Sequence, residues 1–241
     1  MAVLSEVGWV FLRLWAPRRP GPRPRKPGKI YFQIRGLRDP GEFGQAAASA
    51  PADCAQLTSV EAMRDRVNAE LGAPDIVVAF AGGGTGWPMP LEQITEEDWR
   101  SSIDNNLTST FFTLKCFLPA MTQRRSGCIV NMASAGGRVA AGAPAGYGAA
   151  KAGVIMLTRH LAHEVGKYDV RVNCVSPSAV LTERTRQAIS DEQEQQMRAA
   201  FPLCRLGHPR DVAAATLFLL SSASSWITGA TLDVAGGRVM S

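Results

Sequence analysis

Residues 134–153 read SAGGRVAAGAPAGYGAAKAG, and they follow an apolar stretch, CIVNMAS, that ends at Ser134. The apolar stretch predicts a buried strand, and the run of small residues from Ala145 onward predicts a helix. On such a helix Tyr147 and Lys151 lie one turn apart on the same face. This strand–loop–helix unit therefore predicts that Ser134, Tyr147 and Lys151 meet at one place.

These three side chains suit proton transfer. A tyrosine hydroxyl titrates at a pKa of ~10, and a depression of roughly 3 units, on the order of 4 kcal/mol, makes it usable near neutral pH. An ammonium group one turn away favours the phenolate, and Ser134 could hold the substrate oxygen that Tyr147 protonates. The alternative is a small-residue helix on which Tyr147 and Lys151 merely reach solvent.

The size and composition indicate one core-forming unit. The chain has 241 residues, of which 46% are hydrophobic, enough for one substantial core. We expect a single domain over residues 29–241, preceded by an irregular arm over residues 1–28. Five cysteines without metal-ligand spacing indicate reduced thiols and no metal site, which suits a cytoplasmic protein. No apolar run reaches the ~18 residues of a membrane span, and the start of the chain is a poor signal peptide.

The positive charge is confined to one segment. Residues 7–38 hold nine arginines or lysines and no acidic residue, while the rest of the chain holds 17 basic and 21 acidic residues, a net charge of −4. Such a segment can bind nucleic acid or an anionic membrane. Because RRPGPRPRKPG lacks interleaved aromatic residues and a helical repeat, we interpret it as an irregular arm and expect neither partner.

Strands and helices alternate from Asp53 onward, which is typical of a parallel sheet covered by helices on both faces. The predicted strands are 75–81, 127–133, 170–175 and 231–234, and the predicted helices are 57–71, 107–124, 145–166, 183–200 (one helix or two short ones) and 209–222. Before Asp53 only residues 29–35 predict a strand, and residues 1–28 are not expected to pack. The expected fold class is α/β, with a doubly wound parallel sheet of the Rossmann type.

Six motifs occur in a fixed order: DIVVAFAGG, DNNLTSTF, IVNMAS, Tyr147-x-x-x-Lys151, VRVNCVSPSAVLT and ITGATLDVAGG. Together they resemble the short-chain dehydrogenase/reductase family, in the branch that contains 3-oxoacyl-carrier-protein reductases and many sugar and steroid alcohol dehydrogenases. The resemblance implies a nicotinamide cofactor, NAD or NADP, across the carboxyl ends of the strands. It also implies a homodimer or homotetramer formed through helices near residues 107–121 and 148–161.

The resemblance implies roles for individual residues. Tyr147 would be the general acid in reduction and the base in oxidation, Lys151 would hold the nicotinamide ribose and lower the tyrosine pKa, and Ser134 would orient the substrate oxygen. Asn106 would hold, through its backbone, a water that links Lys151 to solvent; the alternative is an asparagine that kinks a helix. The residues implied in cofactor binding are Asp53, Ala81, Gly82, Gly83, Tyr147, Lys151, Pro177, Val180 and Thr182. The last three belong to the loop that would meet the nicotinamide carboxamide.

Some of these residues also have a local interpretation. Asp53 would contact the adenine amino group, and alone it is an ordinary turn or capping residue. Gly82 and Gly83 fit a turn at which the backbone passes close to a ribose. Asn173 is expected to tie neighbouring strands together and not to touch a ligand.

Two departures from the family pattern concern the cofactor half. The family usually has two asparagines before Ala-Gly, and here the sequence reads Ala79-Phe80-Ala81-Gly82, which weakens the expected cofactor affinity. The glycine-rich loop whose amides bind the pyrophosphate is missing, since the nearest text, GLRDPGEFG, has the wrong spacing. We therefore expect the first strand and the glycine-rich loop to be absent or altered. Either a start-site, splice or reading-frame change or a divergent cofactor site fits this pattern.

The prediction for function is an NAD(P)-dependent oxidoreductase that interconverts a carbonyl and a secondary alcohol, with Tyr147 as proton donor or acceptor. The alternative is a catalytically impaired family member that acts as a binding or oligomerising subunit, because the loop that binds the pyrophosphate is missing.

Overall fold

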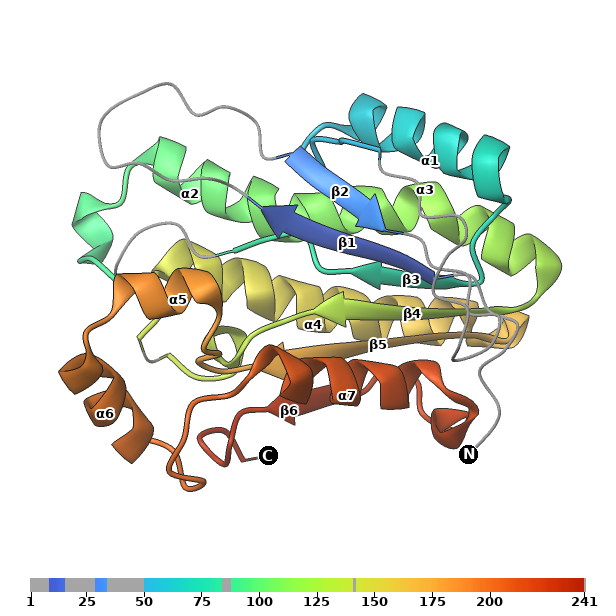
Figure 1. Cartoon of the computed structure of the whole chain (residues 1–241). Coiled ribbons are helices and arrows are strands. Elements are labelled where there is room, and N and C mark those ends of the chain that lie inside the picture. Colours follow the sequence, from blue (N-terminus) through green and yellow to red (C-terminus); the bar gives the residue numbers. More distant parts are fainter. Residues whose placement is uncertain (1–8, 16–28, 34–49, 84–87, 141, 241) are drawn as a thin grey trace.

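The computed structural model describes residues 9–15, 29–33, 50–83, 88–140 and 142–240 (Figure 1). The strands are β1 Trp9–Trp15, β2 Lys29–Gln33, β3 Ile76–Ala79, β4 Gly127–Met132, β5 Val170–Pro177 and β6 Thr231–Val234. The helices are α1 Leu57–Leu71, α2 Glu96–Ile103, α3 Ser109–Arg124, α4 Ala145–Val165, α5 Glu183–Ala188, α6 Asp191–Ala199 and α7 Pro209–Leu220. A π-helical turn, Asp104–Thr108, joins α2 to α3.

The strands of the described residues form one sheet in the order β2-β1-β3-β4-β5-β6. The strands from β1 to β6 run parallel, except that β2 pairs antiparallel with β1 at the edge. Figure 1 shows α4 behind the sheet and α7 in front of it. This arrangement confirms the predicted doubly wound α/β class and adds one antiparallel edge strand.

Alternate residues of the central strands enter two apolar layers. Val77 and Ile129 pack with buried residues of α1, α3 and α4, whereas Val78 and Val130 pack with buried residues of α7. Successive residues of a strand point to opposite faces, so a strand covered on both faces needs an uninterrupted apolar run. The four residues of β3, IVVA, are accordingly all buried. The two layers hold the carboxyl ends of β3, β4 and β5 at a common edge.

The predicted element boundaries agree closely with the structure from α1 to β6. The polar stretch 183–200 forms the two short helices α5 and α6, which was one of the two predicted forms. The helix predicted to begin near Leu107 begins instead at Ser109, because the π-helical turn precedes it. Asn173 confirms its predicted role: its Nδ2 donates to Ile227 O (2.9 Å) and its Oδ1 accepts from Ala230 N (3.0 Å), which ties β5 to the segment before β6.

The expectation that residues 1–28 would not pack is wrong for Trp9–Trp15. These residues form β1, which pairs parallel with β3. Without β1, the outer edge of β3 would present unpaired N–H and C=O groups. The sequence WVFLRLW is rich in aromatic and branched residues of the kind that favours strands. The predicted strand over residues 29–35 is confirmed as β2, and the other predictions for the first 49 residues, including the glycine-rich loop, lie outside the described residues.

Among the residues that the structure describes, no helix is both long and apolar enough to cross a membrane. The same residues contain no group of three or more His, Cys, Asp and Glu side chains that could hold a metal ion. The five cysteines are free thiols; Cys204 is exposed and the other four are buried.

Candidate active site

Neighbouring elements bring the predicted catalytic residues to the carboxyl edge of the sheet. Ser134 lies just beyond the end of β4, and Tyr147 and Lys151 lie in the first two turns of α4. Ser134 is extended (φ −166°, ψ 152°), and its Oγ accepts a hydrogen bond from Gly136 N at 3.2 Å. This bond orients the serine side chain at the start of the loop that leads to α4.

Tyr147 is largely buried and interacts with Ser134. Burial raises the pKa of Tyr147 above its ordinary value of 10.0, and a hydrogen bond with the Ser134 side chain opposes part of that increase. The sequence predicted a lowered pKa because of Lys151. In the structure desolvation has the larger effect, since a phenolate is poorly solvated in a buried site. The hydroxyl of Tyr147 is therefore protonated at neutral pH.

Lys151 is a buried cation, with 1% of its surface exposed. Its Nζ donates to Met132 O at 2.8 Å and lies 5.7 Å from the centre of the Tyr147 ring. Burial lowers the pKa of Lys151 from 10.5 to about 8, with a small opposing effect of Cys174. The hydrogen bond with the carbonyl at the end of β4 holds the ammonium group in place, and the charge lies beside the ring of Tyr147.

Asn106 joins the loop after β3 to the helix pair α2–α3. It is completely buried in the π-helical turn, and its Oδ1 accepts from Gly83 N at 2.9 Å. Its Nδ2 donates to Ser102 O (2.9 Å) and to Gly83 O (3.3 Å). Its backbone carbonyl accepts from Thr110 Oγ1 at 2.7 Å. Asn106 thus lies at a distortion of a helix, as the alternative interpretation predicted, and its side chain contacts the loop after β3. The water that its backbone would hold stays a prediction.

The turn after β3 tolerates no side chain at Gly82. A Cβ built on Gly82 would lie 2.5 Å from Asn106 Oδ1 and 3.1 Å from Lys151 Nζ, and its φ of 139° also favours glycine. At Gly83 the same construction meets no atom of the described residues within 4 Å. Ala81, just before this turn, is buried. The contacts place Gly82, Gly83, Asn106 and Lys151 in one unit.

The loop after β5 contains the other residues predicted to bind the nicotinamide. Pro177 is the last residue of β5, and Val180 forms a parallel bridge with Gly207. Thr182 caps α5, since its Oγ1 accepts from Thr185 N at 3.1 Å. These contacts give the loop a defined conformation at the same edge of the sheet.

Asp53 takes part in local contacts before α1. Its Oδ1 accepts from Ala55 N at 3.0 Å, and its N–H donates to Ser59 Oγ at 2.9 Å. Within the described part of the chain its hydrogen bonds are all local, as expected of a turn residue. The predicted adenine contact stays a prediction.

Sequence reasoning missed the glycines that set the spacing between Ser134 and Lys151. A Cβ on Gly137 would lie 2.6 Å from Ala152 N and from Lys151 C, and a Cβ on Gly148 would lie 2.9 Å from Gly136 O. The loop after Ser134 therefore packs directly on the backbone of α4. The available signal was the Gly136-Gly137 pair facing a helix of small residues.

Known proteins resemble this chain over most of its length. A family model described as enoyl-(acyl carrier protein) reductase matches residues 37–238. The 3-oxoacyl-[acyl-carrier-protein] reductase FabG of Vibrio cholerae is 40% identical over 182 residues, 76% of this chain and 73% of that protein. FabG of Escherichia coli strain K12 is 38% identical over the same shares of the two chains. The crystal structure of a 3-oxoacyl-[acyl-carrier protein] reductase with bound NAD from Brucella melitensis has a TM-score of 0.71 and 33% identity, and the match covers 80% of this chain and 71% of that one.

These matches agree with the order of the six sequence motifs and with the parallel strands β3 to β6. They also cover the elements that carry Ser134, Tyr147 and Lys151. This chain belongs to the short-chain dehydrogenase/reductase family of NAD(P)-dependent oxidoreductases, in the branch of the 3-oxoacyl-acyl-carrier-protein reductases.

Proposed function

We propose that this chain interconverts a carbonyl group and a secondary alcohol, with Tyr147 as the proton donor or acceptor. The observation that carries the proposal is the buried side chain of Lys151 beside Tyr147, whose hydroxyl is hydrogen-bonded with Ser134. Lysine is almost never fully buried without a partner, because the desolvation of its charge is costly. A buried charge that lowers the stability of the fold is typical of a functional site.

Tyr147 suits the donor role in reduction because its raised pKa keeps the hydroxyl protonated at neutral pH. As the carbonyl oxygen gains negative charge, Tyr147 donates its proton to that oxygen and Ser134 holds it in place. The ammonium of Lys151 then stabilises the phenolate that remains. Asn106, which contacts the neighbouring turn, is proposed to belong to the path by which the proton is replaced.

A bound nicotinamide supplies the hydride in reduction or accepts it in oxidation. The side chain of Lys151 has three N–H donors, and Met132 O takes one of them, so the other two suit ribose hydroxyls. We propose that the following residues hold this cofactor: Asp53, Ala81, Gly82, Gly83, Tyr147, Lys151, Pro177, Val180 and Thr182. The contacts near Lys151 serve the nicotinamide end, which NAD and NADP share, and both are proposed.

The relatives support a substrate class. They are named 3-oxoacyl-[acyl-carrier-protein] reductases, and the family model is also described by an acyl-carrier-protein substrate. We therefore propose a 3-oxoacyl thioester, reduced at its 3-carbonyl, as the first substrate to test.

We also propose that copies of this chain form a homodimer or homotetramer through α3 and α4. Phe111 on α3 and Met156 on α4 are large apolar side chains that are 45% and 60% exposed, and a second copy packed on these helices would cover them. Light scattering of the purified protein tests this proposal, and a monomer at micromolar concentration would contradict it.

The enzymatic proposal is tested first by titrating NADH and NADPH against tryptophan fluorescence. Reduction of acetoacetyl-coenzyme A is then compared between the wild type and Tyr147→Phe. We expect saturable binding of at least one cofactor and a loss of about 10²–10⁴-fold in kcat for Tyr147→Phe, with cofactor binding retained. Tyr168→Phe is the matched control, since Tyr168 lies beyond the end of α4. Absence of saturable binding at millimolar cofactor would contradict the proposal for this chain.

A further inference from the structure

The segment between β5 and α7 leaves the sheet after β5, and its two ends meet at an isolated β-bridge between Val180 and Gly207. Gly207 N donates to Ala179 O at 3.0 Å, and Leu181 N donates to Gly207 O at 2.8 Å. Residues 182–206, which include α5 and α6, lie between the two chain segments that this bridge joins. The two stems of this excursion therefore meet beside Val180, in the loop predicted to contact the nicotinamide carboxamide.

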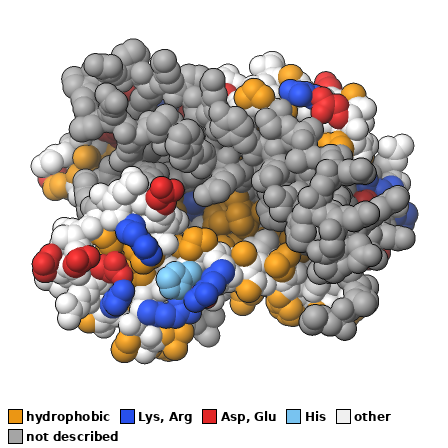
Figure 2. All heavy atoms as spheres, viewed as in Figure 1, with side chains coloured by type: hydrophobic (Ala, Val, Ile, Leu, Met, Phe, Trp, Pro, Cys, Tyr) orange, Lys and Arg blue, Asp and Glu red, His pale blue; other side chains and the backbone are white. Residues whose placement is uncertain are grey.

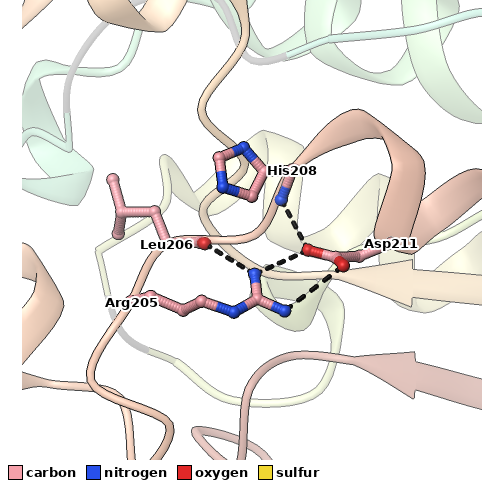
Figure 3. A network of polar contacts seen from close by, with 4 residues as sticks. All are labelled: Arg205, Leu206, His208 and Asp211. Carbon is pink, nitrogen blue, oxygen red and sulfur yellow. Dashed lines mark hydrogen bonds and ion pairs between the residues drawn. The ribbon is translucent and has the colours of Figure 1, made fainter.

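An ion pair ties the second stem to the first turn of α7 (Figure 3). Arg205 Nη1 and Nη2 donate to the two carboxylate oxygens of Asp211 at 2.7 and 3.2 Å. Arg205 Nη1 also donates to Leu206 O at 3.0 Å, and His208 N donates to Asp211 Oδ2 at 2.7 Å. Asp211 thus holds residues on both sides of Gly207.

This ion pair is open to solvent. The side chains of Arg205 and Asp211 are 47% and 26% exposed. Figure 2 shows basic side chains gathered around a histidine on this face, where Figure 1 places α5, α6 and the start of α7. Exposed ion pairs add little to overall stability. Arg205 precedes Gly207 in the chain and Asp211 follows it, and Gly207 forms the bridge with Val180. This position indicates that the ion pair affects the local conformation at the bridge.

We propose that Arg205 and Asp211 are positioning residues, which hold Gly207 against Val180 and thereby fix the loop Pro177–Thr182 for the cofactor. The proposal rests on the proposed function, because that function assigns the loop to the nicotinamide. Asp211 lies on α7, whose Val212 and Leu219 are buried against the sheet. The ion pair with Asp211 therefore holds Arg205 and the neighbouring Gly207 in a fixed position relative to this helix. Loss of the pair frees the stem without disturbing Tyr147 or Lys151.

The first test needs no cofactor and no activity. Hydrogen exchange of the Gly207 and Leu181 amides is compared in the wild type, Arg205→Gln and Arg66→Gln. Arg66 forms a comparable exposed ion pair with Glu70 on α1, at 2.7 Å, and serves as the control. We expect exchange at the two bridge amides to become about fivefold faster in Arg205→Gln, with other protected amides unchanged. Unchanged exchange at the bridge overturns the proposal whether or not the chain is an enzyme.

The second test separates cofactor binding from catalysis. In Arg205→Gln we expect the KM for the nicotinamide cofactor to rise about three- to tenfold, while kcat changes less than about twofold. Arg205→Lys keeps a charge beside Asp211 and should recover part of the loss. The double variant with Asp211→Asn, which keeps an oxygen acceptor for His208 N, should be no worse than Arg205→Gln alone. An unchanged KM together with faster exchange overturns the link to the cofactor loop, and a wild type without cofactor binding refutes the proposed function instead.

Discussion

Lys151 and Arg205 are cations near the same edge of the sheet, in opposite environments. Lys151 is 1% exposed, and a backbone carbonyl accepts its hydrogen bond; Arg205 is 47% exposed and pairs with a carboxylate. Burial lowers the pKa of Lys151, whereas the pKa of Arg205 is raised by its hydrogen bond with Asp211. In the proposed mechanism the chemistry depends on a buried charge whose desolvation is costly, whereas the proposed positioning of the neighbouring loop depends on an exposed ion pair, which costs little to form.

The largest expected effect comes from removing the buried charge. Lys151→Met keeps most of the side-chain volume but removes the ammonium that stabilises a Tyr147 phenolate. We expect kcat/KM for acetoacetyl-coenzyme A to fall about 10²–10⁴-fold, measured by oxidation of NADPH or NADH. Lys115→Met, at an exposed position of α3, is the control. Activity of Lys151→Met within a small factor of the wild type would show that the buried charge has no catalytic role.

The next effect concerns pH. Between about pH 8 and 10.5 Lys151 is deprotonated in the folded chain but still protonated when unfolded. The unfolded state then binds more protons, so the contribution of Lys151 to the free energy of unfolding rises with pH in this window. Relative to Lys151→Met, we expect the wild type to gain on the order of 2 kcal/mol between about pH 8 and pH 9.5, measured by urea unfolding. The range stops there because the raised pKa of Tyr147 has the opposite effect above its ordinary value of 10.0. A constant difference between the two proteins would contradict the lowered pKa.

The third effect concerns Asn106, the uncharged buried side chain that bonds Gly83 and Ser102 beside Lys151. Asn106→Ala leaves the partly buried N–H group of Gly83 and the buried carbonyl group of Ser102 without their partner. We expect a loss of about 1–3 kcal/mol in the free energy of unfolding, together with weaker cofactor binding. Asn105→Ala is the control, because the neighbouring side chain is exposed and bonds Ser101 Oγ. Equal losses in the two variants would show that the loop after β3 does not depend on Asn106.

The smallest effect on stability is expected at the exposed pair. Arg205→Gln should change Tm by less than about 2 °C, because exposed ion pairs contribute little to global stability. Its effect on the cofactor KM should exceed its effect on Tm. A large drop in Tm would show that the Arg205–Asp211 pair stabilises the whole fold. The contrast between this exposed pair and the buried charge of Lys151 would then be wrong.

The unit around β4 and α4 could be predicted closely from the sequence. An apolar strand, a small-residue loop and a helix with Tyr147 and Lys151 four residues apart are local patterns. The strand-tying role of Asn173 was also predictable from its place in a buried strand. The Arg205–Asp211 pair could not be predicted, because RLGHPRD contains two arginines that could pair with Asp211. The choice of Arg205 depends on the conformation that the chain adopts where Gly207 bridges Val180.

By itself the sequence determined the alternation of strands and helices, the choice of candidate site residues and the resemblance to one family, since these depend on local periodicity and residue order. The tertiary structure alone decided that Trp9–Trp15 lies beside β3, because an unpaired strand edge accepts a suitable segment from anywhere in the chain. It also decided the direction of the Tyr147 pKa, since desolvation depends on every element packed around the hydroxyl and not on the lysine one turn away.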